Sequence, residues 1–251
     1  MADPALFQYT LRLADNGLIL GHRLSEWIGH APLLEEELAL GNIALDLIGQ
    51  ARALYAYAGA FEGAGRDEDA LAYRRDAGEF RNLLLVELPN GDFAETIVRL
   101  TCFASFMERY WAALAGSADA TLGAIAAKAE KEAAYHARHA GEWLIRLGDG
   151  TEESHRRAQE ALDALWPYTG ELFESDAIEE TLIAQGVAVD PAALRGTWDA
   201  RLAALIAEAT LRRPEAGWMQ SGGRSGRHSE YLGHLLATMQ SLNRAHAGAV
   251  W

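Results

Sequence analysis

The sequence predicts an all-α protein built on a ferritin-like four-helix bundle, with additional helices towards its C-terminus. Three observations support this fold class. Half of the 251 residues are apolar, and only six are proline. No run of β-branched residues indicates a strand. Four long segments repeat their apolar residues at helical spacing, as the core-facing helices of a bundle do.

The first two long helices are expected at about residues 5–29 and 33–62. Pro32 separates them, because proline suits the first turn of a helix and not its interior. The second helix ends at the glycine-rich break 63–65, where the chain can turn freely.

The other two long helices follow the turn signal of residues 89–91, Pro-Asn-Gly. Asp92 is the expected cap of the third helix, whose apolar repeat runs to Leu114, and the fourth is expected at about 118–147. Shorter helices are expected between the two pairs, at 67–75 and 79–88. Two long helices, an intervening segment and two more are typical of a ferritin-like bundle with one long crossover.

The remaining third of the chain is also expected to be helical. We predict helices near 152–172, 175–185 and 190–211, then a loop over 212–228 and a last helix at 229–246. The whole chain, 1–251, is expected to form one domain, with a core bundle at about 5–148 and additional helices at about 151–251.

The charge and the cysteine content argue against several functions. The chain has 22 basic and 36 acidic residues, a formal net charge of −14, so nucleic acid and anionic membranes are not expected partners. Cys102 is the only cysteine, which excludes an intrachain disulfide. There is no secretory signal pattern and no apolar run near the roughly 18 residues that span a bilayer, so a cytoplasmic location is expected.

The only literal Glu-x-x-His motif begins at Glu152 and ends at His155. Ferritin-like oxygenases hold two irons with such motifs on two helices, because residues i and i+3 share one helix face. This copy, however, directly follows Thr151, the expected N-cap of a helix. Acidic residues in a first turn are explained by the helix dipole, so we interpret the motif as a helix start.

The fourth helix carries a histidine where an inward metal ligand would lie. His136 falls on the apolar stripe, but Ala133 occupies the position three residues earlier, where the carboxylate belongs. Glu132 is one position off and lies at i, i+4 spacing from His136. We interpret His136 as a core histidine that is hydrogen-bonded by a carboxylate.

The second helix carries a polar stripe of Asn42, Asp46 and Gln50 at i, i+4 and i+8. Its motif-like part runs from Asp46 to Gly49, and glycine has no side chain that could bind iron. The stripe either faces solvent or forms a buried polar network left from an ancestral metal site, which would have to be fully hydrogen-bonded.

The helical spacing of four further polar residues also suggests contacts. His22 and Glu26 of the first helix could join the polar network of the second. Glu95 and Arg99 of the third helix are expected to form an i, i+4 surface pair.

The two Glu-x-x-His motifs are therefore altered at three of their four positions. The degenerate di-iron positions are Asp46, Gly49, Ala133 and His136. A working di-iron centre needs several carboxylates together with histidines. The sequence predicts no catalytic residue and no metal or other cofactor in this chain.

The loop of residues 221–228 is the most basic stretch in an acidic protein. Its glycines would let a ligand approach the backbone, and Arg224 and Arg227 could bind a phosphate or carboxylate. It is not a Walker loop, because the Gly-Lys-Ser/Thr ending is missing. Either it pairs with acidic neighbours, or Arg224 and Arg227 contact an anion or a partner.

Several stretches, in the same order, resemble the C subunits of bacterial phenylacetyl-CoA 1,2-epoxidase. They are LGHRLSEW at 20–27, NIALDLIGQAR at 42–52, NLLLVELPNG at 82–91, KEAAYH at 131–136 and GGRSGRHSEYLG at 222–233. The likeness runs from about residue 10 to residue 251, and the ordered set is far more specific than any one stretch.

The resemblance implies a ferritin-like, non-catalytic structural subunit of a monooxygenase complex in aerobic phenylacetate catabolism. Its partners would be the homologous catalytic A subunit, which holds the di-iron site, and other subunits, and the chain could contact the acyl-CoA indirectly. That complex epoxidises the aromatic ring of phenylacetyl-CoA. A separate reductase with FAD and an iron–sulfur cluster supplies electrons from NADPH.

Two alternatives stay open on the sequence. One is a metal-binding oxygenase that is active on its own and uses Glu26, Asp46, Glu132 and His136. The other is an acyl-CoA-binding or docking subunit that uses Arg224 and Arg227.

Overall fold

The computed structural model describes residues 3–215, 217–246 and 249. Within these residues the chain is made of α-helices and short 3-10 turns, and it has no β-strand. The prediction of an all-α protein is confirmed. None of the described helices has the length and apolarity needed to cross a membrane.

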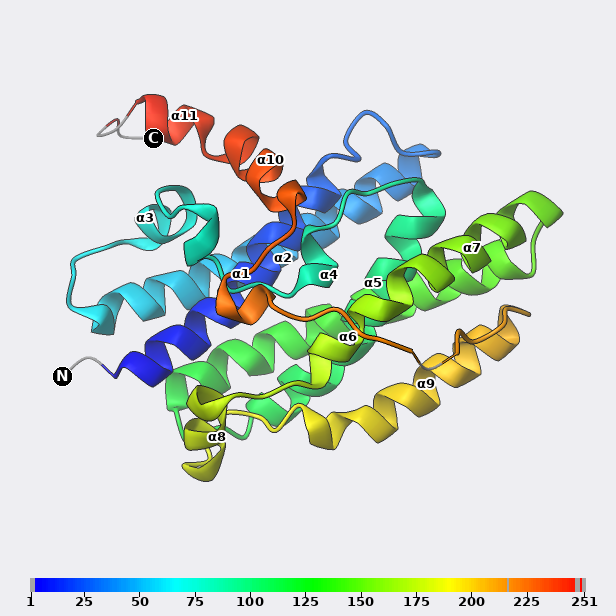
Figure 1. Cartoon of the computed structure of the whole chain (residues 1–251). Helices are drawn as coiled ribbons and strands as arrows, with labels where there is room; N and C mark the ends of the chain where they lie inside the picture. The colour runs from blue at the N-terminus through cyan, green and yellow to red at the C-terminus, as the bar shows by residue number, and fades with distance from the viewer. Residues whose placement is uncertain (1–2, 216, 247–248, 250–251) are drawn as a thin grey trace.

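Four long helices form the bundle of a ferritin-like fold (Figure 1). They are α1 (Pro4–Ser25), α2 (Leu34–Glu62), α5 (Phe93–Leu114) and α6 (Ala120–Gly148). Helix α1 packs along α2, α5 packs along α6, and α2 also contacts α6. The crossover between the two hairpins contains the short helices α3 (Glu68–Tyr73) and α4 (Leu84–Glu87), so the expected two pairs and one long crossover are present.

Aspartates begin three of the four bundle helices. Asp3 accepts hydrogen bonds from the first turn of α1, and Asp119 does the same for α6. Asp92 forms a capping box with Glu95 at the start of α5. These side chains satisfy backbone N–H groups that have no partner inside the helix. Helix α2 has no side-chain cap, and its first turn holds three glutamates that suit the helix dipole.

The C-terminal helices lie against the bundle and the crossover. They are α7 (Glu152–Leu165), α8 (Ala177–Ala184), α9 (Arg195–Glu208), α10 (Glu230–Met239) and α11 (Ser241–Ala245). Helices α7 and α9 contact α5 and α6, α8 contacts α1, and α10 contacts α4. Figure 1 shows α10 and α11 beside the crossover, and α8 and α9 along the opposite side of the bundle.

Two of the predicted helices are interrupted. The segment expected at 152–172 leaves α-helical geometry after Leu165 and continues as 3-10 turns, because Pro167 lacks the N–H that a longer helix would need. The helix expected at 229–246 is divided at Gln240, whose side chain donates to the carbonyl oxygen of Arg75 at 2.9 Å.

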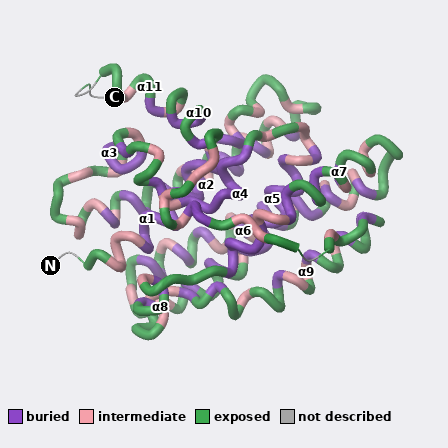
Figure 2. Tube along the Cα trace, viewed as in Figure 1, coloured by how far each residue is buried: buried purple, intermediate pink, exposed green. Residues whose placement is uncertain are grey.

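One cluster of buried apolar residues extends from Tyr9 in α1 to Leu236 in α10. Figure 2 shows the buried segments gathered where the four long helices and α4 meet, with exposed segments on the outer sides of α7, α8 and α9. Trp198 of α9 joins this core and donates its indole N–H to the carbonyl oxygen of Cys102 at 2.9 Å. The bundle and the added helices therefore share one interior.

The crossover is attached to α1 through a buried carboxylate, Asp15. This side chain is fully buried and accepts from the Tyr55 hydroxyl at 2.5 Å, the Arg81 backbone N–H at 2.7 Å and Arg75 Nη1 at 3.0 Å. The Arg75 guanidinium also lies 4.1 Å from the centre of the Phe80 ring. A buried charge that is paired and hydrogen-bonded in this way is tolerated, and here it joins α1, α2 and the crossover.

Candidate metal centre

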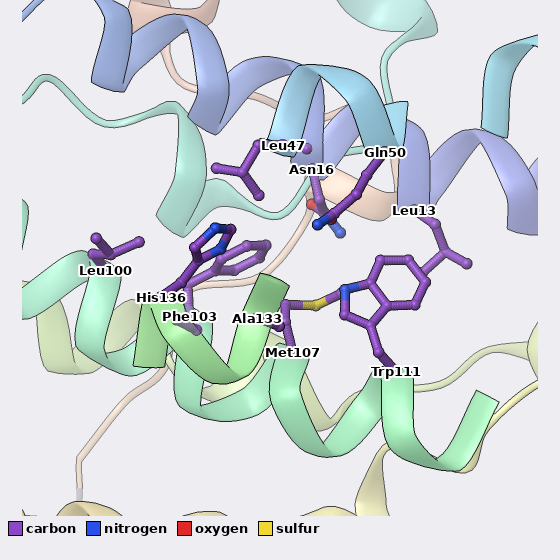
Figure 3. A pocket seen from close by; sticks show the side chains of 12 residues that line it. Leu13, Asn16, Leu47, Gln50, Leu100, Phe103, Met107, Trp111, Ala133 and His136 are labelled. Atoms are coloured by element: carbon purple, nitrogen blue, oxygen red, sulfur yellow. The ribbon is translucent and has the colours of Figure 1, made fainter. Parts of the chain in front are cut away.

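A small cavity lies between the four bundle helices, at the place where ferritin-like oxygenases bind metal. Its volume is about 10 Å³, close to the minimum that holds one water molecule. Figure 3 shows Asn16 and Gln50 entering it from one hairpin, and Met107, Trp111, Ala133 and His136 from the other. The other lining residues are Leu13, Gly17, Leu47, Leu100, Phe103 and Ala104.

Helices α2 and α6 each present one pair of residues at i, i+3 spacing to this cavity. On α6 the pair is Ala133 and His136, both buried, as the sequence indicated. On α2 the pair is Leu47 and Gln50. Asp46 and Gly49, the degenerate positions expected there, do not line the cavity.

Asp46 and Gly49 lie one residue before the inward pair. The Asp46 side chain is 37% exposed at the rim of the α2–α6 interface. Gly49 is exposed, and a Cβ atom built on it would meet no other atom within 4 Å. The residues of α2 that face the cavity are therefore Leu47 and Gln50, each one position later than the residue that the sequence suggested.

The side chains at the cavity do not fit a di-iron centre. They supply one imidazole from His136 and two amides from Asn16 and Gln50, but no carboxylate. The Asn16 oxygen already accepts a hydrogen bond from the Leu83 N–H at 2.8 Å. Paired irons need several carboxylates. Among the described residues, no three or more His, Cys, Asp or Glu side chains are grouped so that they could hold a metal ion.

His136 is hydrogen-bonded by a carboxylate, and that carboxylate is Asp46. His136 Nε2 lies 3.0 Å from Asp46 Oδ2. Burial lowers the pKa of His136, although Asp46 and Glu132 act in the opposite direction, so the neutral imidazole is favoured. The expected i, i+4 contact with Glu132 is replaced by this bond between helices.

Glu132 binds Gln50 instead. The Gln50 amide donates to Glu132 Oε2 at 2.9 Å, and Lys128 lies 3.4 Å from the other Glu132 oxygen. The polar stripe on α2 thus leads from exposed Asn42 through half-buried Asp46 to buried Gln50. Both interpretations of the stripe hold in part, because one end faces solvent and the other forms a satisfied polar network.

His22 and Glu26 do not join this network. Glu26 accepts from Arg23 at 2.9 Å and from the Asn90 amide at 3.1 Å, which ties it to the crossover. The His22 ring meets the Tyr73 ring edge to face, with the centroids 6.5 Å apart. The set of four residues considered for an independent oxygenase is therefore not assembled around one point.

The expected surface pair of Glu95 and Arg99 is wrong. Glu95 is engaged in the capping box, where its Oε2 accepts from the Asp92 N–H at 2.9 Å. Arg99 is buried and donates to the Leu88 and Pro89 carbonyl oxygens and to the Asn90 side chain. Its guanidinium holds the end of the crossover against α5.

The literal Glu-x-x-His motif is a helix start, as interpreted. Thr151 accepts from the Ser154 N–H at 3.1 Å and caps α7. His155 Nδ1 lies 2.7 Å from the carbonyl oxygen of Gly148, so this histidine serves the junction between α6 and α7. Glu152 is exposed.

The basic loop pairs with buried acidic neighbours. Arg224 Nη1 lies 2.6 Å from both oxygens of Glu179, and the N–H groups of Gly222 and Gly223 donate to Glu171 Oε1 at 2.9 and 2.8 Å. Arg227 is exposed, and its guanidinium has no hydrogen-bond or ion-pair partner among the described residues. Of the two arginines, only Arg227 is free to meet a ligand.

Arg212 and Arg213, at the start of the same loop, are paired as well. Arg212 lies 3.0 Å from Asp163 and Arg213 lies 2.6 Å from Asp199. The basic stretch seen in the sequence is therefore largely neutralised in three dimensions.

His228 and Glu87 form an ion pair that the sequence did not reveal. The fully buried Glu87 carboxylate meets His228 Nδ1 at 2.7 Å and accepts from the Ser229 N–H at 2.6 Å. Burial lowers the pKa of His228, but its contacts with Glu87 and with the Phe80 carbonyl oxygen outweigh this, and the net shift is upward. The pair attaches the C-terminal loop to α4.

Two comparisons with known proteins agree with each other. The family model described as "Phenylacetic acid catabolic protein" matches residues 1–251. The chain is 50% identical, over 246 residues, to a protein of Escherichia coli (strain K12) that is named as the C subunit of 1,2-phenylacetyl-CoA epoxidase. That alignment covers 98% of this chain and 99% of the relative.

Proposed function

The chain belongs to the family of phenylacetic acid catabolic proteins, and from this we propose that it is a non-catalytic structural subunit of a phenylacetyl-CoA epoxidase complex. The identity of 50% over nearly the whole length of a protein named as an epoxidase subunit supports membership of such a complex. The donor set at the bundle cavity supports the non-catalytic role, because it lacks the carboxylates that two irons require.

The proposed partner is a homologous catalytic A subunit that carries the di-iron site. This chain would stabilise that subunit and hold it in position within the complex, in the cytoplasm. Electrons would come from NADPH through a reductase with FAD and an iron–sulfur cluster, so this chain would need no cofactor of its own. The bundle cavity, at about 10 Å³, is far smaller than the roughly 300–1,000 Å³ of sites that bind drug-sized ligands. The acyl group is therefore expected to bind outside this cavity.

The first prediction concerns metal and activity. The purified chain should contain no stoichiometric iron and show no epoxidation of phenylacetyl-CoA, whereas activity should appear when the catalytic subunit and the reductase are added. Metal analysis and product formation would be measured on the isolated chain and on the complex. In the complex, His136→Gln should leave the turnover rate unchanged, because the proposal gives His136 a structural role as the hydrogen-bond partner of Asp46.

Two irons per isolated chain, together with loss of activity in His136→Gln, would contradict the proposal and support an independent oxygenase.

The acyl-CoA-binding alternative rests on Arg227, whose surface pocket is also lined by Glu171, Glu174 and Asp176. These carboxylates disfavour a phosphate group there. Tighter acyl-CoA binding to the wild type than to Arg227→Glu would support that alternative.

A further inference from the structure

The chain from residue 221 to residue 246 lies as a strap over the crossover. This C-terminal strap contains α10 and α11, which Figure 1 shows beside the crossover, and α10 contacts α4. Leu232, Leu235 and Leu236 of α10 are buried in the apolar core. Detachment of the strap would therefore expose core residues to water, which costs free energy.

The attachment just before α10 depends on one histidine that meets two acceptors. His228 Nδ1 lies 2.7 Å from Glu87 Oε2, and its Nε2 lies 3.0 Å from the carbonyl oxygen of Phe80. A neutral imidazole has one N–H group and one lone pair, so it can donate to only one of these oxygens. The imidazolium has two N–H groups and fits both contacts. The geometry therefore calls for a proton on each ring nitrogen.

The surroundings of Glu87 make loss of that proton costly. Glu87 is fully buried, and its carboxylate also accepts from the Asn82 amide at 2.8 Å and from the Ser229 N–H at 2.6 Å. Neither of these donors carries a charge. A neutral His228 would leave a buried carboxylate without its counter-charge, and breaking a buried ion pair in this way is strongly destabilising.

Other charged groups in this region do not replace that counter-charge. They are Asp15 and Arg23 of α1, Arg75 and Arg81 of the crossover, and Arg227 and Glu230 of the strap. Asp15, like Glu87, favours the protonated form of His228. Arg23 and Arg81 donate to the backbone oxygens of Glu87 and Phe80, and Arg75 binds Asp15. Among the described residues, His228 is the one cation in contact with the Glu87 carboxylate.

We propose that the C-terminal strap is a pH-sensitive device, which is closed while His228 is an imidazolium held between Glu87 and Phe80 and which opens more readily once that proton is lost. The inference does not depend on the proposed function, because it concerns this chain by itself. The opening is local, so the bundle helices stay folded while α10 detaches.

The direction of the pH effect follows from proton linkage. Burial lowers the pKa of His228, but its contacts outweigh this and the net shift is upward, so the closed strap holds the proton more tightly than the open strap does. The strap is therefore most firmly closed below the ordinary histidine pKa of about 6.5. Between that value and the higher closed-state pKa, the open fraction should grow by about tenfold per pH unit, and above it the open fraction should be constant.

Hydrogen–deuterium exchange of the whole chain without denaturant, between about pH 6 and pH 9, tests the proposal. The intrinsic exchange rate at each pH is divided by the measured rate, which gives the protection factor of each helix. His228→Gln removes the titrating group. The matched control is His155→Gln, which removes another histidine at a junction, where Nδ1 meets one carbonyl oxygen at 2.7 Å. Circular dichroism would show that both variants are folded.

In the wild type and in His155→Gln, α10 should be less protected than α5, and its protection should fall by up to about tenfold per pH unit before it levels off. The levelling should coincide with the titration midpoint of the His228 imidazole, measured by nuclear magnetic resonance. His228→Gln should give a flat profile for α10. Constant protection of α10 in the wild type, or the same fall in His228→Gln, would overturn the proposal. Equal protection of α10 and α5 would also overturn it, because the strap would then open only when the whole chain unfolds.

Discussion

Individual buried side chains in this protein act mainly as attachment points between distant segments. Asp15, Glu87 and Glu171 are nearly or fully buried carboxylates, and each accepts hydrogen bonds from the crossover or from the C-terminal loop. Such groups are costly to bury unless each charge is satisfied. These carboxylates are satisfied only when the crossover and the C-terminal loop are docked as described, so they favour that one arrangement of the two segments.

The His228–Glu87 pair predicts a pH dependence of stability. The folded-state pKa of His228 is raised, so the folded protein holds this proton more tightly than the unfolded chain does. The resulting stability should be fully present below the unfolded pKa of about 6.5 and should be lost as the pH rises through the higher folded value. Denaturant unfolding of the wild type and of His228→Gln between pH 6 and pH 9 would measure it.

The variant should show a flatter profile over this range, because it has no proton to lose at that position. The opposite effect is expected from His136, whose lowered pKa removes stability as the pH falls below about 6.5. His136→Gln is therefore the matched control, and it should leave the alkaline part of the profile unchanged. An alkaline slope that is identical in the wild type and in His228→Gln would contradict the assignment.

Residues on well-defined amphipathic helices could be placed from the sequence, and others could not. His136 was placed correctly because α6 has a clear apolar stripe. The register of α2 was off by one position because that helix is apolar on nearly every side, so its pattern does not say which face is inward. Gln50 could have been found as the last member of the polar stripe. Arg99 was misplaced because the pairing rule for helix surfaces takes no account of a capping box that already engages Glu95.

At the scale of helices and turns, the ends of the long helices follow from local signals. Aspartate caps, the glycine that ends α2, and the turn at 89–91 act within a few residues of the chain, which is why the sequence revealed them. The 3-10 turns around Pro167 and the break at Gln240 depend on packing against other segments, and local patterns do not contain that information.

The capping box of α5 gives a prediction at this scale. Asp92→Ala should lower the free energy of unfolding by about 1 kcal/mol, within a range of roughly 0.5–2 kcal/mol for loss of an N-cap, because the Glu95 N–H would lose its partner. The same substitution removes the partly exposed ion pair with Arg157, which contributes little. Denaturant unfolding would measure the change. The control is Asp69→Ala, an exposed aspartate that caps no helix, and its effect should stay within about 0.5 kcal/mol. Equal effects of the two substitutions would contradict the capping argument.

At the scale of the whole molecule, we propose that residues 1–251 form a single domain with the bundle at its centre. The support is the continuous apolar core from α1 to α10 and the hydrogen bond from Trp198 to the α5 backbone. The order of the helices could be predicted from the sequence. The docking of the C-terminal loop on the crossover could not, because it depends on contacts between residues more than 100 positions apart.

A single domain predicts one cooperative unfolding transition. Far-ultraviolet circular dichroism, which reports on all helices, and tryptophan fluorescence, which includes Trp198 in α9 and Trp111 in α5, should give coincident curves in denaturant. A first transition confined to the fluorescence of the C-terminal helices, followed by melting of a bundle at about residues 5–148, would contradict this prediction. Comparison with Trp198→Phe isolates the contribution of Trp198 from that of the other six tryptophans.

The hydrogen bonds between the C-terminal loop and the crossover also bear on how the protein is made. The ribosome releases α2 and its exposed leucines early, but Glu87 and Leu84 of the crossover receive their final partners only from residues 171 and 228–229. A nascent chain would therefore carry the exposed leucines of α2 for most of the time it takes to be translated, before the C-terminal loop has docked on the crossover.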